Sequence, residues 1–536
     1  MIQKVANQEN AERPTTDTES DGKSMSTRIY NTLSRQKEVF EPVVPGKVGI
    51  YCCGPTVYAP SHVGHVVGPV IFDTVKRFLR YRGYDVTFVI NITDVDDKII
   101  NKAAEEKTST EELAERITAD YIEHLGRLGV EVDHFPRATK YIPHMLAMIE
   151  TLVKKGFAYP SGGDVYFDVT RHPAYGKLSN RNIDEMMAGA RKEVSDLKRH
   201  PSDFALWKGA KAGEPAWESP WGPGRPGWHI ECSAMSMDLL GETFDIHGGG
   251  LDLCFPHHED EIAQSECCTG KTYAKYWMHN GLMQYGDDTR KMGGRCMAEE
   301  GDIASQEAAK MSKSKGNIVT LAKLLSDYSP ELIRFFLLST HYRSPISFSD
   351  ERLKEVGALL EKAHTFAERY EQVMGSAFYE LKAPQTWAEA PFEAGGSEFL
   401  GRVVELRNRY LEFMDDDFNT AGAIGTMAEL ITLLNRQAGS YESSKDEATK
   451  TEFAAGAVVL KELADILGIL TKAPESAGGD DQLTASLLDL LLKVRQMARQ
   501  EKSFALSDAI RDELAELGVT IKDGKEGSSW KIESSH

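Results

Sequence analysis

A strand–helix–strand pattern near the amino end constrains the fold of this chain more than any other feature. Val48–Cys53 is an apolar run typical of a buried strand, and a Gly-Pro pair ends it. A helical pattern follows from about Val63 to Arg82, and Val86–Ile90 is a second apolar strand. These three elements form a βαβ unit, so we predict an α/β fold with a parallel, Rossmann-like sheet.

The size and composition of the chain indicate several domains in a reducing compartment. With 536 residues, the chain is too long for one hydrophobic core, and we expect two to four domains. No run of about 18 apolar residues occurs, so we expect no transmembrane helix and no membrane partner. The seven cysteines include two adjacent pairs, which does not suit a disulfide framework and favours the cytoplasm.

The charge of the chain limits how it can bind nucleic acid. The formal net charge of −20 argues against non-specific nucleic-acid binding through overall charge, but specific binding through a local basic surface remains compatible with this charge.

The first 24 residues are polar and acidic, so we expect a disordered tail and not a signal or transit peptide. Met25 is a second candidate for the initiator.

The stretch from Gly224 to Glu266 is rich in residues that bind metals. His257 and Glu261 are four residues apart, so on a helix their side chains share one face, and Cys232 can add a thiolate. Cys53, at the end of the first strand, is the best candidate for a fourth ligand. Two thiolates, an imidazole and a carboxylate suit Zn²⁺. The alternative is a solvated helix face beside two core cysteines.

Two further motifs bear on the function. His62-Val-Gly-His65 follows the first strand, and Lys310-Met-Ser-Lys-Ser314 lies far downstream. Together with Trp228-His-Ile-Glu-Cys232 between them, these motifs resemble the class I aminoacyl-tRNA synthetases, and among those the cysteinyl-tRNA synthetases. The resemblance runs from about residue 27 to residue 532.

The resemblance implies a two-step reaction in which cysteine attacks Mg-ATP and the cysteinyl group then passes to tRNA(Cys). It assigns catalysis, through charge stabilisation and not through a protein nucleophile, to His62, His65, Lys310 and Lys313. The residues expected to bind ATP are His62, Gly64, His65, His247, Gly249, Asp252 and Lys313. Three glycines at 248–250 are expected to let the backbone approach that ligand closely.

The resemblance also implies that one zinc ion per chain selects the substrate, because a thiolate binds zinc far better than a hydroxyl does. The residues expected around cysteine are Cys53, Thr56, Thr93, Trp228 and His257. For Trp228 the alternative is a core anchor.

A polar segment of 26 residues, 284–309, sets this sequence apart from many relatives, and we expect it to be a mobile extension of the loop that carries Lys310–Ser314.

The second half of the chain is expected to contact tRNA. A helical pattern begins at Ser349-Asp350, and we predict an antiparallel bundle followed by a small anticodon-binding domain. The expected tRNA contacts are Arg499, Phe504, Asp508 and Asp523. The expected segments are a tail (1–26), a first catalytic half (27–120), an insertion (121–224), a second catalytic half (225–285), a loop and stem-contact region (286–348), the bundle (349–476) and the anticodon domain (477–536).

One alternative function shares most of these features. An ATP-dependent ligase that joins cysteine to a small amine, of the mycothiol-pathway type, also resembles these synthetases but lacks the anticodon-reading tail. Residues 477–536 therefore favour tRNA as the acceptor. A non-catalytic zinc protein is disfavoured because both ATP motifs are intact. We expect the chain to act as a monomer.

Overall fold

A computed structural model describes residues 26–181, 196–285, 320–389, 392–474, 481–524 and 527–532. The expected amino-terminal tail, most of the 284–309 segment and the Lys310–Ser314 motif lie outside the described residues. Within the described part of the chain, no helix is both long enough and apolar enough to span a bilayer.

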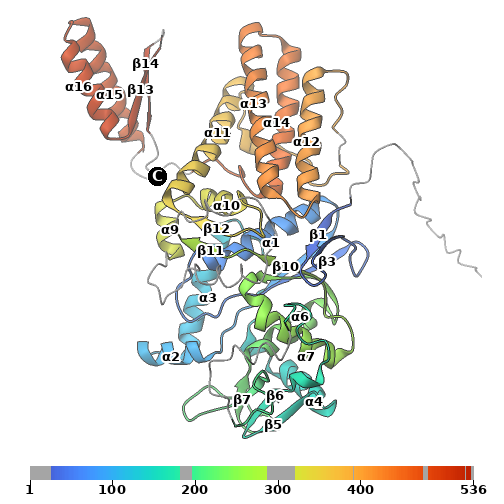
Figure 1. Cartoon of the computed structure of the whole chain (residues 1–536). Helices are drawn as coiled ribbons and strands as arrows, with labels where there is room; N and C mark the ends of the chain where they lie inside the picture. The colour runs from blue at the N-terminus through green and yellow to red at the C-terminus, as the bar shows by residue number, and fades with distance from the viewer. Residues whose placement is uncertain are drawn as a thin grey trace, which may run out of the picture.

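A parallel sheet with strand order β10–β9–β3–β4 forms the centre of the catalytic half (Figure 1). Its strands are β3 (Lys47–Cys52), β4 (Asp85–Ile90), β9 (Phe244–Gly250) and β10 (Ala274–Asn280). The helix α1 (Gly64–Tyr81) connects β3 to β4 and buries most of its apolar residues. The predicted βαβ unit is therefore confirmed, and α1 continues through Pro69.

Several short elements surround this sheet. The antiparallel pair β1 (Arg28–Asn31) and β2 (Gln36–Val39) joins it through a hydrogen bond from the Thr32 N–H to the Trp277 carbonyl, 2.9 Å long. The remaining elements of this part are α2 (Asp97–Glu106), α3 (Thr110–Arg127), α6 (Trp228–Leu240), the 3₁₀ turn η3 (Leu251–Leu253), the irregular turn η4 (Cys254–His258) and α7 (Glu259–Thr269).

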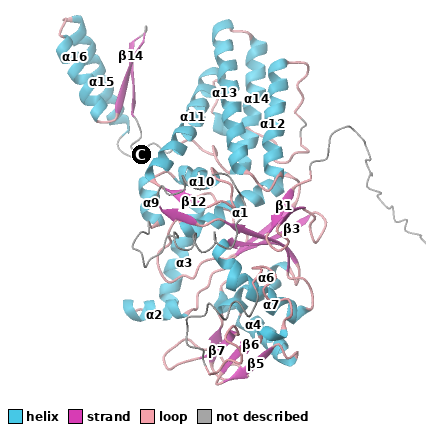
Figure 2. Cartoon of the chain, viewed as in Figure 1, coloured by secondary structure: helices cyan, strands magenta, loops and turns pink. Residues whose placement is uncertain are grey.

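The segment between the two halves of the sheet forms a small layer of its own. Its antiparallel sheet has the order β5–β6–β7–β8 and lies at the lower end of the molecule in Figure 2. Its elements are η1 (Ala138–Lys140), α4 (Ile142–Lys154), β5 (Ala158–Ser161), β6 (Asp164–Phe167), η2 (Val169–Arg171), β7 (Phe204–Gly209) and β8 (Gly224–Pro226). This layer packs against α6 and α7 through a second hydrophobic core.

The carboxyl half is helical, as predicted. The parallel pair β11 (Met283–Tyr285) and β12 (Ile346–Phe348) leads from the sheet into it. Its helices are α9 (Leu321–Asp327), α10 (Pro330–Leu338), α11 (Asp350–Met374), the short η7 (Phe378–Glu380), α12 (Glu398–Asp415), α13 (Thr420–Ser444) and α14 (Glu447–Leu467). The side chain of Ser349 accepts a hydrogen bond from the Arg352 N–H, which confirms the predicted start of the first long helix.

The last part of the chain is a small α/β unit that stands beside the bundle (Figure 1). It contains α15 (Asp481–Gln500), α16 (Phe504–Glu516), β13 (Val519–Gly524) and β14 (Gly527–Ile532), and the two strands pair antiparallel. Leu488, Leu514 and Val519 form its core, with Trp530 packed against them. The small unit expected to follow the bundle is therefore present, with a core of its own.

Candidate metal centre and active site

Four side chains from three segments meet at the end of β3. Cys53 follows β3 directly, and Cys232 lies on the first turns of α6. His257 lies in the turn η4, and Glu261 lies in the first turn of α7, which follows η4 directly. The Cys53 Sγ lies 3.8 Å from the Cys232 Sγ and 3.5 Å from the Glu261 Oε1. The His257 Nε2 lies 3.5 Å from the Cys232 Sγ and 3.1 Å from the Glu261 Oε1. The predicted spacing of His257 and Glu261 thus brings both side chains to one place.

These distances match the geometry of a tetrahedral metal site. With Zn–S bonds of about 2.3 Å and Zn–N bonds of about 2.0–2.1 Å, the ligand atoms of a tetrahedron stand roughly 3.3–3.8 Å apart. The ligand atoms of all four residues lie within 4.8 Å of one another. Two sulfurs, one nitrogen and one oxygen form a donor set that fits Zn²⁺.

Burial of these groups also favours a bound cation. Burial raises the pKa of the Cys53 and Cys232 thiols and lowers the pKa of the His257 imidazole well below its usual value. A neutral imidazole is the form that binds metals, whereas two thiolates need a positive charge beside them. Cys52 is buried as well but does not belong to the group, which supports Cys53 as the ligand of the adjacent pair.

A second set of residues orients His257 from behind. The Nδ1 atom of His257 shares a hydrogen bond of 2.8 Å with the Nδ1 atom of His229, and the His229 Nε2 lies 3.3 Å from the Asp260 Oδ2. The Tyr175 hydroxyl donates to the other oxygen of Asp260. Such partners fix the ring orientation of a metal-binding histidine. Sequence reasoning did not assign a role to His229 or Asp260, although both lie within the motifs that it identified.

His247 contacts this group and does not face an open pocket. Its side chain is fully buried, its Nε2 lies 2.8 Å from the Glu261 Oε2, and its ring stacks on Trp277 at 4.4 Å. The Tyr273 hydroxyl donates to the same Glu261 oxygen at 3.1 Å. In this structure His247 therefore orients Glu261, and its expected contact with adenosine stays a prediction.

His247 also belongs to an alternative ligand set. Cys53, His247, His258 and Glu261 bring their ligand atoms within the same 4.8 Å. We favour the set with Cys232 because its two sulfurs suit zinc and because the Nε2 of His257 already points at Cys232 and Glu261.

The glycines at 248–250 allow other side chains to pack closely against the backbone of the sheet, which the sequence did not predict. They belong to β9 and do not form an open loop. A Cβ on Gly248 would come within 2.1 Å of the Phe72 ring of α1, and one on Gly249 within 2.9 Å of His258. The expected close approach of this backbone to a ligand stays a prediction.

Trp228 covers the metal group from the solvent side. Its indole stacks on the His257 ring, with centroids 4.1 Å apart, and the side chain is 38% exposed. The alternative of a core anchor is therefore wrong. Thr93 is buried and donates a hydrogen bond of 2.9 Å to the buried carboxylate of Glu231, and Thr56 forms a bridge with Thr93.

The two histidines of the first motif lie together at the start of α1. Their rings stack with centroids 3.7 Å apart, and the Gly64 N–H donates to the His62 Nδ1 at 3.1 Å. The amino end of a helix favours anions, so this place suits phosphate. Thr320 forms a bridge with His62, and the Leu321 N–H donates to the Ser61 carbonyl at 2.8 Å. The chain that carries Lys310 and Lys313 therefore returns beside this motif, although both lysines lie outside the described residues.

The expected tRNA contacts in the last unit are exposed where the structure describes them. Phe504 is 60% exposed at the start of α16, Arg499 is exposed at the end of α15, and the Asp508 carboxylate lies 3.3 Å from Arg511. The side chain of Asp523 lies outside the described residues.

Asp252, which is expected to bind ATP, lies half-buried in η3, immediately after β9.

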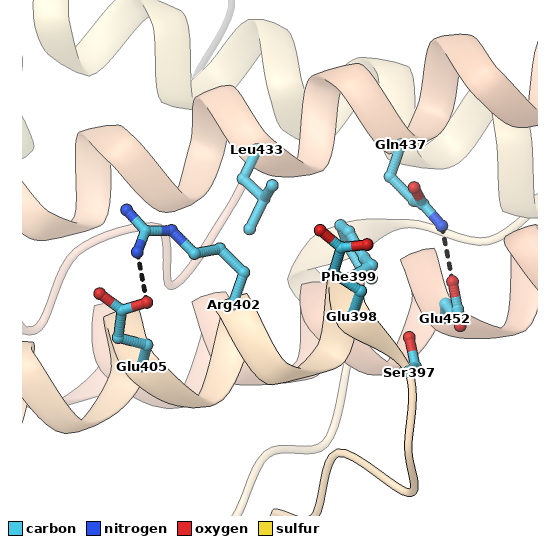
Figure 3. A pocket seen from close by; sticks show the side chains of 8 residues that line it. All are labelled: Ser397, Glu398, Phe399, Arg402, Glu405, Leu433, Gln437 and Glu452. Atoms are coloured by element: carbon cyan, nitrogen blue, oxygen red, sulfur yellow. Dashed lines mark hydrogen bonds and ion pairs between the residues drawn. The ribbon is translucent and has the colours of Figure 1, made fainter.

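A separate groove of about 740 Å³ lies on the helical bundle, far along the chain from the metal group (Figure 3). Phe399 and Leu433 form its apolar wall, and Glu398, Arg402 and Gln437 contribute polar groups. The groove contains both acidic and basic side chains and none of the residues that the motifs identified.

Comparison with known structures defines the class of the fold. Two solved structures of Mycobacterium tuberculosis methionyl-tRNA synthetase with methionyl-adenylate resemble this chain, with TM-scores of 0.57 and 0.54 at 17% and 16% identity. They cover 86% and 83% of this chain, and the matches span 96% and 94% of theirs. The sheet with its inserted layer and helical carboxyl half is thus the fold of a class I aminoacyl-tRNA synthetase.

Sequence comparison narrows the class to one family. Residues 39–295 and 300–358 match the class I (C) tRNA synthetase catalytic domain, 409–471 match the DALR domain, and 483–530 match the cysteinyl-tRNA ligase anticodon binding domain. A cysteine–tRNA ligase of Geobacter metallireducens is 45% identical over 95% of this chain and 100% of its own length. One of Moorella thermoacetica is 45% identical over 94% and 99%. The chain belongs to the cysteine–tRNA ligase family.

Proposed function

We propose that this chain activates L-cysteine with Mg-ATP and transfers it to the 3′-terminal adenosine of tRNA(Cys). The observation that carries the proposal is the group Cys53, Cys232, His257 and Glu261, whose ligand atoms have the spacing of a tetrahedral zinc site. Trp228 stacks on His257 of this group with its indole partly exposed, and we propose that the substrate binds on this side.

In this proposal, the four ligands hold one zinc ion per chain, which supplies a soft acceptor for the sulfur of cysteine that a serine hydroxyl does not match. Trp228 covers the substrate and Thr93 orients its polar end. Because the site can select cysteine by a bond that only cysteine makes, a separate editing site is unnecessary.

We assign the first step to the residues at the start of α1. His62 and His65 donate to the phosphates of ATP while the carboxylate of cysteine attacks the α-phosphorus, and Lys313, with Lys310, stabilises the departing pyrophosphate. Gly64, Gly249, His247 and Asp252 are proposed to bind the rest of the nucleotide. No protein nucleophile takes part, since positioning and charge stabilisation are sufficient.

For the second step, we propose that the last unit reads the anticodon through Arg499, Phe504, Asp508 and Asp523, with Phe504 stacking on a base.

We place the limits of the domains near those expected from the sequence, except that the insertion begins after α3, because residue 121 lies within that helix. We further propose that one chain suffices, because the metal ligands and both histidines come from one chain. We also propose that it works in the cytoplasm, as the cysteine content of the sequence favours.

The small-amine ligase is not favoured. The match of residues 483–530 to an anticodon-binding domain argues for tRNA as the acceptor. The deciding experiment is cysteine-dependent exchange of pyrophosphate into ATP, measured beside charging of tRNA(Cys). Exchange with charging supports the proposal, whereas exchange without charging, together with transfer to a small amine, would contradict it.

A further inference from the structure

Two side chains of α10 hold the point where the chain leaves α14. The Arg334 Nε donates a hydrogen bond of 2.7 Å to the Leu467 carbonyl, the last residue of α14. Glu331, one turn earlier on α10, accepts a hydrogen bond of 2.6 Å from the Leu470 N–H. Residues three apart on a helix share one face, so a single face of α10 binds both ends of this four-residue segment.

The backbone between these two contacts has an unusual conformation. Gly468 has a φ of 66°, and a Cβ there would come within 2.7–2.9 Å of the Arg334 guanidinium. Leu470 has a φ of 52°, which a leucine rarely adopts. Such a conformation persists when surrounding contacts determine it. The hydrogen bonds from α10 supply those contacts and so determine the backbone of residues 467–470, where the chain leaves the bundle.

Arg334 also joins this exit to the catalytic half. Its guanidinium is buried, and its Nη2 lies 2.5 Å from the Asp73 Oδ2 on α1, while its Nη1 donates to the Leu128 carbonyl at 3.2 Å. The Asp73 carboxylate is fully buried and accepts from the Glu131 N–H at 2.9 Å. The helix that begins with Gly64 and His65 is therefore tied through one arginine to the end of α14.

The last unit makes a second attachment to the same place. The Lys531 Nζ of β14 lies 2.6 Å from Glu361 on α11. His364, three residues further on the same helix, lies 3.1 Å from the other oxygen of Glu331. The chain exit at Leu470 and the contact at Lys531 thus converge on the paired helices α10 and α11. Figure 1 shows α10 at the base of the bundle and α11 rising from there along it.

On the basis of the proposed tRNA-charging function, we propose that Glu331 and Arg334 are positioning residues that set the placement of the anticodon-reading unit relative to the active site. A unit that follows a well-determined exit and is held by the contact between Lys531 and Glu361 loses less freedom when tRNA binds across both sites. An anticodon contact made by a well-placed unit then contributes to the orientation of the 3′ end. Neither residue touches the metal group or the first motif, so cysteine activation does not depend on them directly.

The test compares two reactions in the full chain. Charging is measured with tRNA(Cys) and with the same tRNA carrying one changed anticodon base, and pyrophosphate exchange is measured without tRNA. In Glu331→Ala and Arg334→Lys, we expect the preference for the correct anticodon to fall by about tenfold, or about 1.4 kcal/mol. Exchange should stay within about twofold of the unsubstituted chain.

Two further variants separate positioning from a general loss of stability. Glu331→Gln retains an oxygen that can accept from the Leu470 N–H, so it should recover most of the anticodon preference. Arg369→Lys changes an arginine that joins α11 to Asn435 and Glu442 and that lies away from the exit, so it should leave the preference unchanged.

Three outcomes of these measurements would overturn the proposed positioning role. An unchanged anticodon preference in Glu331→Ala would overturn the positioning role, even if Arg334→Lys proves too unstable to assay. A parallel loss of exchange and charging would overturn it as well, because it would indicate a structural role alone. Equal charging of the two tRNAs by the unsubstituted chain would instead refute the anticodon-reading function, and the positioning role with it.

Discussion

The Nδ1 atom of His229 lies 2.8 Å from the Nδ1 atom of His257, on the side of the ring opposite to Cys232 and Glu261. Asp260 lies 3.3 Å from the other nitrogen of His229. The path of contacts from Asp260 through His229 to His257 therefore ends at the metal group. This path determines which nitrogen of His257 faces the group. A carboxylate and an imidazole behind a ligand usually strengthen metal binding.

Replacing His229 should weaken zinc binding without removing a ligand. In His229→Ala we expect roughly 10–100-fold lower zinc affinity, because His257 loses the partner that orients it. Competition with a chromophoric chelator measures this affinity. His144→Ala, which changes an exposed histidine, is the control. Equal affinities of the two variants would contradict a role for His229.

The adjacent cysteines Cys52 and Cys53 offer a matched pair for testing the ligand set. Cys53→Ser and Cys232→Ser should lose most of the bound zinc and bind cysteine more weakly, because a serine hydroxyl is a poor zinc ligand. Cys52→Ser should keep its zinc, since Cys52 lies outside the group. Metal analysis of purified protein decides this. Full zinc occupancy in Cys232→Ser would refute the assignment.

Residues 286–309 of the polar segment should be dispensable for chemistry, whereas Gln284 and Tyr285 belong to β11, pair with β12 and are retained. The glycines and polar residues of the segment are typical of a surface loop. Replacing residues 286–309 with a short linker should leave the rate of pyrophosphate exchange within about tenfold, or roughly 1.4 kcal/mol of barrier. Lys313→Ala provides the comparison, because it removes a charge that the reaction is proposed to need. A loss as large as that of Lys313→Ala would show that the segment shapes the active site.

Removing residues 477–536 should separate the two steps of the reaction. Cysteine activation should stay near its normal rate, since the metal group and the first motif lie elsewhere in the fold. Charging of tRNA(Cys) should fall sharply because docking contacts are lost. Arg499→Ala should reproduce part of the defect, about 1–3 kcal/mol if it contacts a base edge. Unchanged charging of the truncated chain would contradict the anticodon role and favour a small-amine acceptor.

The amino-acid sequence by itself determined the local elements and the chemistry of the site. Apolar runs predicted β3 and β4, helical spacing predicted α1 and α11, and the four-residue interval between His257 and Glu261 placed both ligands on one side of a helix turn. These features depend on neighbours within a few residues, so periodicity and residue type are sufficient to predict them.

Only the tertiary structure determined which side chains from distant segments contact one another. It turned His247 towards Glu261, packed Gly248 against Phe72, and brought Arg334 to Leu467, 133 residues further along the chain. It also showed that Trp228 is exposed and not a core residue. Such contacts join segments that are distant in sequence, and their geometry follows from the packing of the whole chain, which no local pattern encodes.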